Sequence, residues 1–180
     1  MKDWNVIINV NQKGFNQAIR ILGDFGLIGK TEFFNVLIMK VDNIPDMLEN
    51  LRNHLEEDPS FLSFLSKLIP ATKIFVFQKP EEFEQRIREL VPAWVPLLKG
   101  KGFHVRMHRR GFKGRISSLD EERMLNEFLV ELTKEGGNPG RITFDNPDII
   151  IAVETVAHRA GLSIWTREEL QRYPFIRLDG

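Results

Sequence analysis

The sequence has 180 residues, of which 42% are hydrophobic and 28% are charged, as is usual for a globular protein of one or two domains. It contains no Cys, which excludes disulfides, thiolate catalysis and Cys-based zinc sites. Its 25 Lys and Arg residues balance 25 Asp and Glu residues, and no apolar run approaches the ~20 residues that a membrane span needs. We expect a cytoplasmic protein with no membrane partner, no metal site and no cofactor.

The first eighty residues alternate between strand and helix patterns. They predict strand Trp4–Val10, helix Gly14–Phe25, strand Thr31–Val41, a helix from Ile44 to Leu55, a short helix from Phe61 to Ile69 and strand Ala71–Gln78. Such alternation is typical of a small ferredoxin-like α/β sandwich. We therefore expect an α+β protein whose residues 1–79 form an N-terminal ferredoxin-like domain.

One segment of this half looks like a phosphate-binding P-loop, because Gly23–Thr31 ends in Gly-Lys-Thr. The fingerprint requires a further Gly at the position that Asp24 occupies. A P-loop also runs from a strand into a helix, whereas the patterns here run from a helix into a strand. We do not interpret the segment as a nucleotide site.

Residues 80–180 are expected to form a second domain with the order helix-helix-strand-helix-strand-strand. A helical pattern runs from Pro80 to Leu98, and Pro92 and Pro96 inside it predict a break. The patterns then predict a strand over 103–108, a helix with the capping box Ser118–Glu121, a short strand Arg141–Asp145, a buried strand Ile149–Val156, a strand Gly161–Trp165 and a last helix capped from Thr166.

Positive charge is concentrated in Lys99–Arg115, which has seven Lys and Arg residues, two His and no acidic residue. The rest of the chain then has 18 basic against 25 acidic residues, a formal charge of −7. Apolar and basic residues alternate from Phe103 to His108, which predicts a strand with its basic residues facing outward. This concentration of positive charge indicates a site for a polyanion such as RNA. The alternative is a solvated edge strand whose positive charge prevents aggregation.

The planar fork of Arg grips phosphate oxygens bidentately. We predict ten RNA-binding residues: Lys99, Lys101, Arg106, His108, Arg109, Arg110, Lys113, Arg115, Arg159 and Arg167. His104 and His108 either stack on a base or contact phosphate, or are exposed strand residues without a role. Phe112 either stacks on an unpaired 3′ base or, preferably, anchors the loop to the core. We expect Glu154 to pair with Arg141 or Arg159 rather than to act in catalysis, and we predict no catalytic residue.

Several of these motifs resemble the THUMP domain, a tRNA-binding module of RNA-modifying proteins. The resemblance is carried by Phe103–Arg110, the capped helix from Ser117, Arg141–Asp148 and Ile149–Glu154. A ferredoxin-like part in front of this module is usual in the family. The resemblance implies a tRNA-binding protein that grips the acceptor stem and the single-stranded 3′ end.

More narrowly, Phe34–Val41, Lys67–Pro70 and Val95–Leu98 resemble the stand-alone THUMP proteins that partner the tRNA cytidine acetyltransferase. This implies an adaptor for tRNA acetylation, with a separate enzyme that uses acetyl-CoA and ATP to make N4-acetylcytidine in the D-arm. Because nothing follows the THUMP-like region, we expect the protein itself not to be an enzyme. The alternatives are a subunit of another tRNA-modifying system, such as a thiouridine synthase or a methyltransferase, and a small RNA-processing enzyme.

Overall fold

The computed structural model describes residues 1–179, which form two compact units. The first unit comprises Met1–Ala71 and Glu169–Leu178, and the second comprises Thr72–Glu168 and Asp179. The units divide after residue 71, whereas the sequence places a domain boundary at 79/80. The difference arises from β5 (Lys73–Val76), which pairs with β9 (Arg159–Thr166) of the second unit's sheet.

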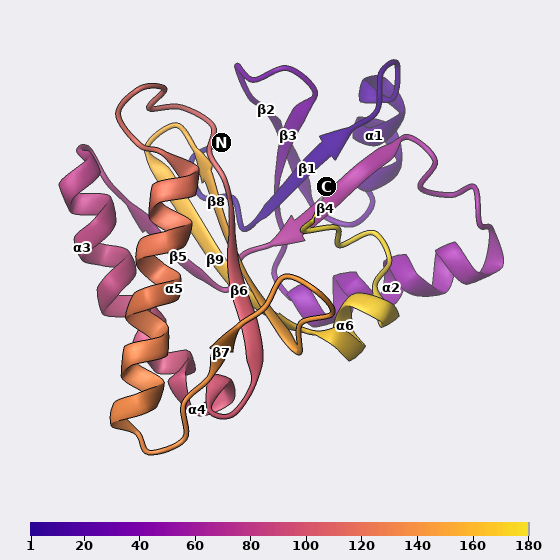
Figure 1. The fold of residues 1–180 in the computed structure, drawn as a ribbon. Coiled ribbons are helices and arrows are strands. Elements are labelled where there is room, and N and C mark those ends of the chain that lie inside the picture. Colours follow the sequence, from indigo (N-terminus) through magenta and orange to yellow (C-terminus); the bar gives the residue numbers. More distant parts are fainter. Residues whose placement is uncertain (180) are drawn as a thin grey trace. The chain divides into compact units, whose positions relative to one another are not determined.

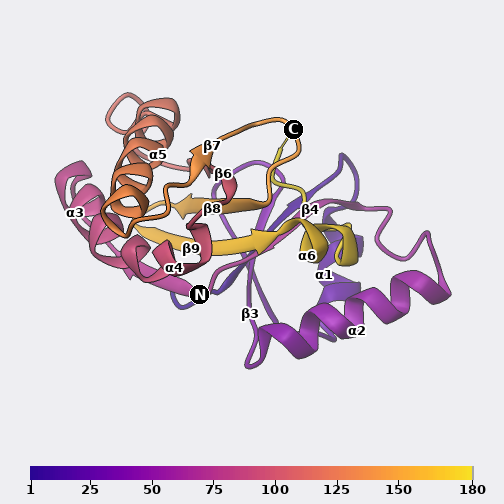
Figure 2. The ribbon, with the colours of Figure 1, turned by 60° about the horizontal axis from the view of Figure 1, so that its bottom comes forward.

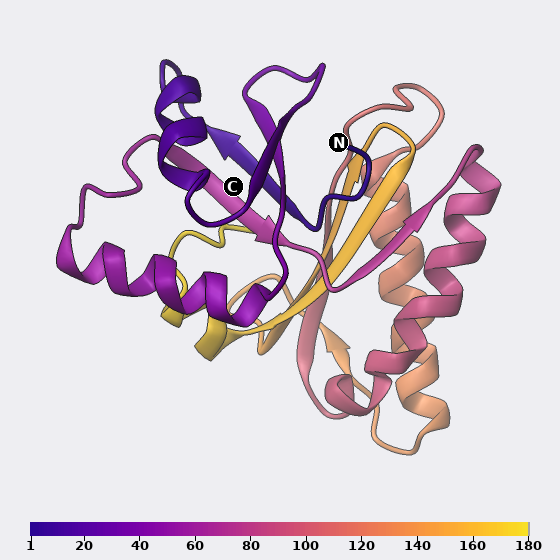
Figure 3. The same cartoon turned by 180° about the vertical axis from the view of Figure 1, so that it is seen from behind.

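The first unit has the predicted ferredoxin-like fold, with the element order βαββαβ. Its elements are β1 (Val6–Val10), α1 (Phe15–Leu22), β2 (Leu27–Lys30), β3 (Val36–Lys40), α2 (Ile44–Glu57) and β4 (Leu65–Pro70). The strands form an antiparallel sheet in the order β2-β3-β1-β4 (Figure 1). Helices α1 and α2 lie on one face of this sheet, where they bury Leu22 and Leu51 (Figure 3).

Two elements of the first unit differ from the prediction. The segment expected to be a helix from Phe61 to Ile69 is a turn followed by β4, whose Leu68 and Ile69 are buried. Pairing with β1 overrides the local preference, since Ile69 lies opposite Ile7 in the register. The second difference is β2, which occupies the segment that looks like a P-loop and forms a hairpin with β3.

The second unit is a five-stranded sheet with helices on one face. Its remaining elements are α3 (Pro80–Leu90), a 3₁₀ turn (Val91–Trp94), α4 (Val95–Leu98), β6 (Gly102–His108), α5 (Ser118–Glu135), β7 (Arg141–Ile142) and β8 (Ile149–Val156). The sheet order is β5-β9-β8-β6-β7, and β6 runs parallel to both of its neighbours. Figure 2 shows α3 and α5 side by side over this sheet, and α6 (Arg167–Arg172) follows β9.

Local sequence signals explain how the helices of the second unit begin and end. The helical pattern after Pro80 breaks at Pro92 and Pro96, as predicted, because proline lacks the backbone N–H that a helix interior requires. Helix α5 is capped by Ser117, whose side chain accepts a hydrogen bond from the Asp120 backbone at 3.3 Å. The cap therefore lies one residue before the predicted Ser118.

Strand β7 is only two residues long, shorter than the predicted Arg141–Asp145. The rest of this edge of β6 is completed by side chains of α5. Asn126 Oδ1 accepts a hydrogen bond from Val105 N at 2.9 Å, and Glu122 Oε1 accepts one from Met107 N at 2.7 Å. Both side chains are buried, so α5 satisfies backbone groups that a longer β7 would otherwise bind.

Candidate nucleic-acid interface

Strand β6 separates the basic stretch into two groups. Lys99 and Lys101 lie before its first residue, and Arg109–Arg115 follow its last. Six residue steps at ~3.3 Å each place the two ends of the strand about 20 Å apart. The stretch that is continuous in sequence is therefore two separate patches joined by a strand.

The neighbouring strands add basic residues to each end. Strand β8 runs parallel to β6, and β9 returns antiparallel to β8. This places Arg167 near the start of β6 and Arg159 near its end. We define the start patch as Lys99, Lys101, Arg141 and Arg167, and the loop patch as Arg109, Arg110, Lys113, Arg115 and Arg159.

The loop patch is built on a buried carboxylate. Glu154 is 1% exposed; its Oε1 lies 2.8 Å from His108 Nδ1, and its Oε2 accepts a hydrogen bond from Arg110 Nη1 at 2.5 Å. Burial alone raises the pKa of Glu154, but the hydrogen bond from His108 and the charge of Arg110 outweigh it and hold the pKa below its ordinary value. The structure thus pairs Glu154 with two residues predicted to bind RNA, whereas the expected candidate Arg141 lies at the other end of β6.

The loop after β6 is anchored through Phe112. Its ring centroid lies 5.0 Å from that of Phe77, and the guanidinium carbon of Arg115 lies 4.9 Å from the Phe112 centroid. Phe112 therefore anchors the loop to the core, which was the preferred alternative. Lys113 and Arg115 are exposed, and within residues 1–179 neither pairs with a carboxylate. Arg109 donates to the Gly111 carbonyl, and no carboxylate in the described part of the chain forms an ion pair with it.

The start patch is organised by Asp148. Its Oδ2 accepts a hydrogen bond from Gly102 N at 2.8 Å, and its Oδ1 lies 3.1 Å from Arg167 Nη2. The Gly102 hydrogen bond and the charges of Arg167, Lys101 and Arg141 hold the pKa of Asp148 below its ordinary value, against a smaller effect of burial. Three cations surround one carboxylate, so the patch is positive. Arg141 is not among the ten residues predicted to bind RNA.

The middle of β6 is less exposed than predicted. His104 is 0% exposed, with Nδ1 2.9 Å from Thr143 O and Nε2 3.2 Å from Asp179 Oδ1. Both alternatives for His104, a base contact and an exposed bystander, are therefore wrong, because the segment after β7 covers this residue. Arg106 Nε donates to Asp179 Oδ1 at 2.8 Å, so this predicted RNA contact also has an internal carboxylate partner.

One carboxyl group beside the loop has an unusual environment. Burial, followed by the neighbouring charge of Glu84, raises the pKa of Glu121 from its ordinary 4.5 to about 7. Glu121 is 6% exposed, and among residues 1–179 no group lies in hydrogen-bonding geometry with its Oε2, although the Glu84 carboxyl is near enough to contribute to the raised pKa. Both carboxyl groups line the same open pocket as Arg115. Because Glu121 is partly protonated near neutral pH, Glu84 and Glu121 together repel a bound phosphate less than they would if both were fully ionised.

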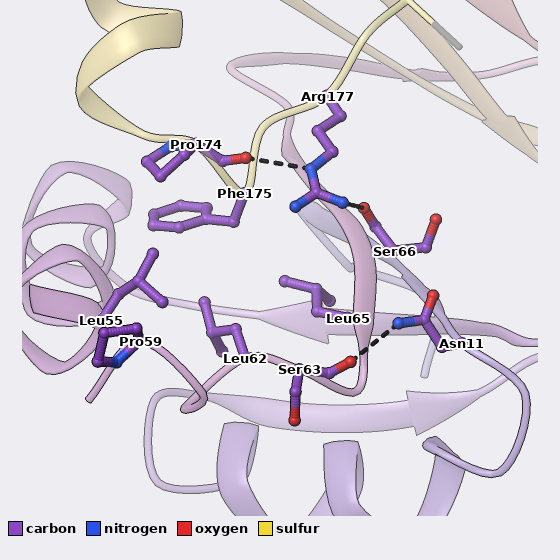
Figure 4. A pocket seen from close by; sticks show the side chains of 10 residues that line it. All are labelled: Asn11, Leu55, Pro59, Leu62, Ser63, Leu65, Ser66, Pro174, Phe175 and Arg177. Atoms are coloured by element: carbon purple, nitrogen blue, oxygen red, sulfur yellow. Dashed lines mark hydrogen bonds between the residues drawn. The ribbon is translucent and has the colours of Figure 1, made fainter.

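The first unit contains a pocket of about 240 Å³, below the roughly 300–1,000 Å³ that is usual for ligand sites. Two of its polar side chains are engaged with backbone carbonyls, since Arg177 Nη1 donates to Ser66 O at 3.2 Å and Asn11 Nδ2 donates to Ser63 O at 2.9 Å. Figure 4 shows the full lining: Asn11, Leu55, Pro59, Leu62, Ser63, Leu65, Ser66, Pro174, Phe175 and Arg177. The lining contains no His, Asp, Glu, Lys or Cys, so no side chain in the pocket could act as the base that activates the hydroxyl of Ser63 or Ser66.

The described residues offer neither a metal site nor a membrane-spanning helix. Within residues 1–179, no three His, Asp or Glu side chains lie together in a way that would hold a metal ion. No helix in this part of the chain is long and apolar enough to cross a bilayer. The basic patches along β6 are therefore the candidate functional site.

Comparison with known proteins supports the fold. The sequence matches no protein-family model and no curated protein. Among solved structures, PH1313 from Pyrococcus horikoshii OT3 superposes with a TM-score of 0.59 at 14% identity, covering 91% of this chain and 55% of that one. TrmN from Thermus thermophilus gives 0.55 at 17% identity, covering 89% and 44%. A possible methylase from Clostridium difficile 630 gives 0.53 at 18% identity, covering 89% and 40%.

These likenesses support the predicted α+β, THUMP-like fold and correct one expectation. The chain spans between 40% and 55% of the length of the structures that it matches. The sequence was expected to encode a non-catalytic protein. The same fold is, however, part of TrmN and of a possible methylase, and these neighbours contradict that expectation.

Proposed function

We propose that this chain is the tRNA-binding part of a tRNA-modifying protein or complex, and that it grips the acceptor stem and 3′ end. The observation that carries the proposal is the pair of positive patches at the two ends of β6, on a chain whose other residues are acidic in sum. Phosphates of an RNA backbone suit such spaced cations, and the surrounding acidity opposes binding in other orientations.

The patches contribute to catalysis by position. A tRNA held by one end presents nucleotides at a set distance, so that an enzyme active site can act on one of them. Methyl transfer is the favoured chemistry, because structures named TrmN and a possible methylase share this fold. Acetylation by a tRNA cytidine acetyltransferase is the second candidate and rests on the sequence resemblance of Phe34–Val41, Lys67–Pro70 and Val95–Leu98.

Binding of intact tRNA over a range of salt concentrations tests the first part of the proposal. If four to six phosphates are engaged, log K should fall against log salt with a slope of roughly −3 to −5. Lys101→Glu and Lys113→Glu should each weaken binding and reduce the slope, because they lie in different patches and are both exposed. Arg123→Glu, an exposed change on α5, is the matched control and should leave the slope unchanged. A wild-type slope near zero would refute the proposal.

Nucleoside analysis identifies the chemistry. Mass spectrometry of tRNA from cells that lack this protein should show the loss of one methylated nucleoside. Loss of N4-acetylcytidine would instead support the acetyltransferase, and loss of thiouridine would support a thiolation system. Unchanged tRNA nucleosides would exclude a role in modification.

A further inference from the structure

Phe144 is a large aromatic side chain that the fold leaves exposed. It is 61% exposed, whereas Phe75, Phe77 and Phe103 of the same unit are at most 4% exposed. Phe144 lies between β7 and β8, and its neighbours in sequence, Thr143 and Asp145, are polar. Isolated exposed apolar residues are common, so the surroundings of the ring decide whether it has a role.

The ring rests on a fixed support. Its centroid lies 4.9 Å from that of His104, with an angle of 41° between the planes. His104 is itself held, because its two ring nitrogens contact Thr143 O and Asp179 Oδ1. One side of Phe144 therefore packs on a buried imidazole while most of its surface remains open to solvent.

The loop that carries the ring is also tied down. Thr143 Oγ1 donates to Asp145 O at 3.0 Å, and Arg167 Nη2 donates to Asn146 O at 2.7 Å. Asn146 adopts a positive φ of 47°, which closes the turn. The ring is thus held in place before any ligand arrives, which lowers the entropy cost of binding against it.

The charges around this loop are those of the start patch. Arg167 bonds the loop backbone and Asp148, and Lys101 and Arg141 act on the same carboxylate. Lys101 and Arg141 are exposed; both act on Asp148 through their charge, but within residues 1–179 neither forms a direct ion pair with a carboxylate. An open aromatic face beside several cations matches a nucleotide, which has a flat apolar base and an anionic phosphate.

We propose that Phe144 is a stacking platform for an unpaired nucleobase of single-stranded RNA, with Lys101 and Arg141 taking the adjacent phosphates. The inference rests on the proposed function and deepens it, because it assigns the start patch to a single-stranded segment. Inside a duplex the bases are stacked on one another and unavailable to the ring. Every base has a π-face, so the platform holds a base without selecting its identity.

Titration of a single-stranded RNA containing 2-aminopurine tests this assignment in the full chain. Phe144→Ala should weaken binding on the order of tenfold, within the range for loss of one stacked base. The salt slope should stay at the wild-type value, since no charge is removed. Phe144→Trp should retain affinity, and wild-type protein should change the 2-aminopurine fluorescence more than Phe144→Ala does. Phe34→Ala removes a ring that is 82% exposed in the first unit and should bind as wild type does.

A second variant keeps the test independent of folding. Phe144→Leu retains an apolar contact with His104 but lacks the aromatic face, and it should lose affinity much as Phe144→Ala does. Wild-type affinity in Phe144→Leu, or binding by Phe144→Ala within twofold of wild type, would overturn the stacking assignment. In either case the proposed tRNA-binding function would still stand if log K for tRNA binding by the wild type falls against log salt with a slope of −3 to −5. A slope near zero in the wild type would instead refute the proposed function itself.

Discussion

Replacing Arg110 with Leu should destabilise the second unit, although Arg110 lies at the start of a surface loop. The Arg110 side chain is 9% exposed, and Glu154 beneath it is 1% exposed. Removing one partner of a buried ion pair leaves the other charge buried and unpaired, which costs about 3–5 kcal/mol. His108 still contacts Glu154 in the variant, so we expect the lower end, about 3 kcal/mol.

Hydrogen exchange of the β8 backbone amides measures this change in the unit concerned. Arg110→Leu should accelerate exchange of the slowest β8 amides by roughly two orders of magnitude, since 1.4 kcal/mol corresponds to a factor of ten. The double variant Arg110→Leu with Glu154→Leu should recover most of the protection, because it leaves no unpaired charge. Lys113→Leu, in the same loop but exposed, is the control and should exchange as wild type does. Exchange within threefold of wild type in Arg110→Leu would refute the reasoning.

The same ion pair sets an acid dependence. The folded-state pKa of Glu154 is lowered below its ordinary 4.5. Its contribution to stability is therefore present above pH 4.5 and is lost as the pH falls below that value towards the folded pKa. The difference in the free energy of unfolding between wild type and Arg110→Leu should therefore become smaller over the same acidic range. A difference that stays constant with falling pH would show that Arg110 acts through packing alone.

Two further substitutions test other parts of the second unit. The pKa of Glu121 is raised from 4.5 to about 7, so the folded protein loses stability as the pH rises through this range and Glu121 ionises. In thermal denaturation, Glu121→Gln should therefore be more stable than wild type at pH 8 but not at pH 4. The shift of about 2.5 pKa units sets an upper limit of about 3.5 kcal/mol on the gain, at ~1.4 kcal/mol per unit. A loss of stability at pH 8 would contradict the assigned environment. Asn126→Leu should cost about 1–3 kcal/mol by leaving the buried Val105 N–H unpaired, and exposed Glu127→Leu is its control. An unchanged melting temperature for Asn126→Leu would show that Val105 N finds another partner.

Much of the fold was predictable because its signals are local. Proline at positions 92 and 96 breaks the helix after Pro80, and alternation from Phe103 to His108 marks β6. β4 was not predictable in this way. Its apolar residues follow an apolar turn, and only pairing with β1, almost sixty residues earlier in the chain, makes them a strand.

The sequence predicts which basic residues could form a site, but it does not predict how they are arranged. Charge counting identified Lys99–Arg115, yet it treated every cation as free to face a ligand. The structure pairs Arg106 with Asp179 and Arg110 with Glu154, partners that are far away in sequence and follow only from strand order. Phe144 could not be identified either, since exposure of a ring depends on the turn that carries it and leaves no periodic pattern.

The discontinuity of the first unit has a consequence for its synthesis. Strand β4 is an edge of that unit's sheet, and Leu68 N donates to Phe175 O across a gap of more than a hundred residues. Phe175 and Leu178 are each 3% exposed, so the unit is incomplete until they leave the ribosome. Residues 72–168 come first, which at 5–20 residues per second takes roughly 5–20 s. During that time the β4 edge and the apolar surface that Glu169–Leu178 will cover remain exposed. A chaperone that binds nascent chains would bind in this interval.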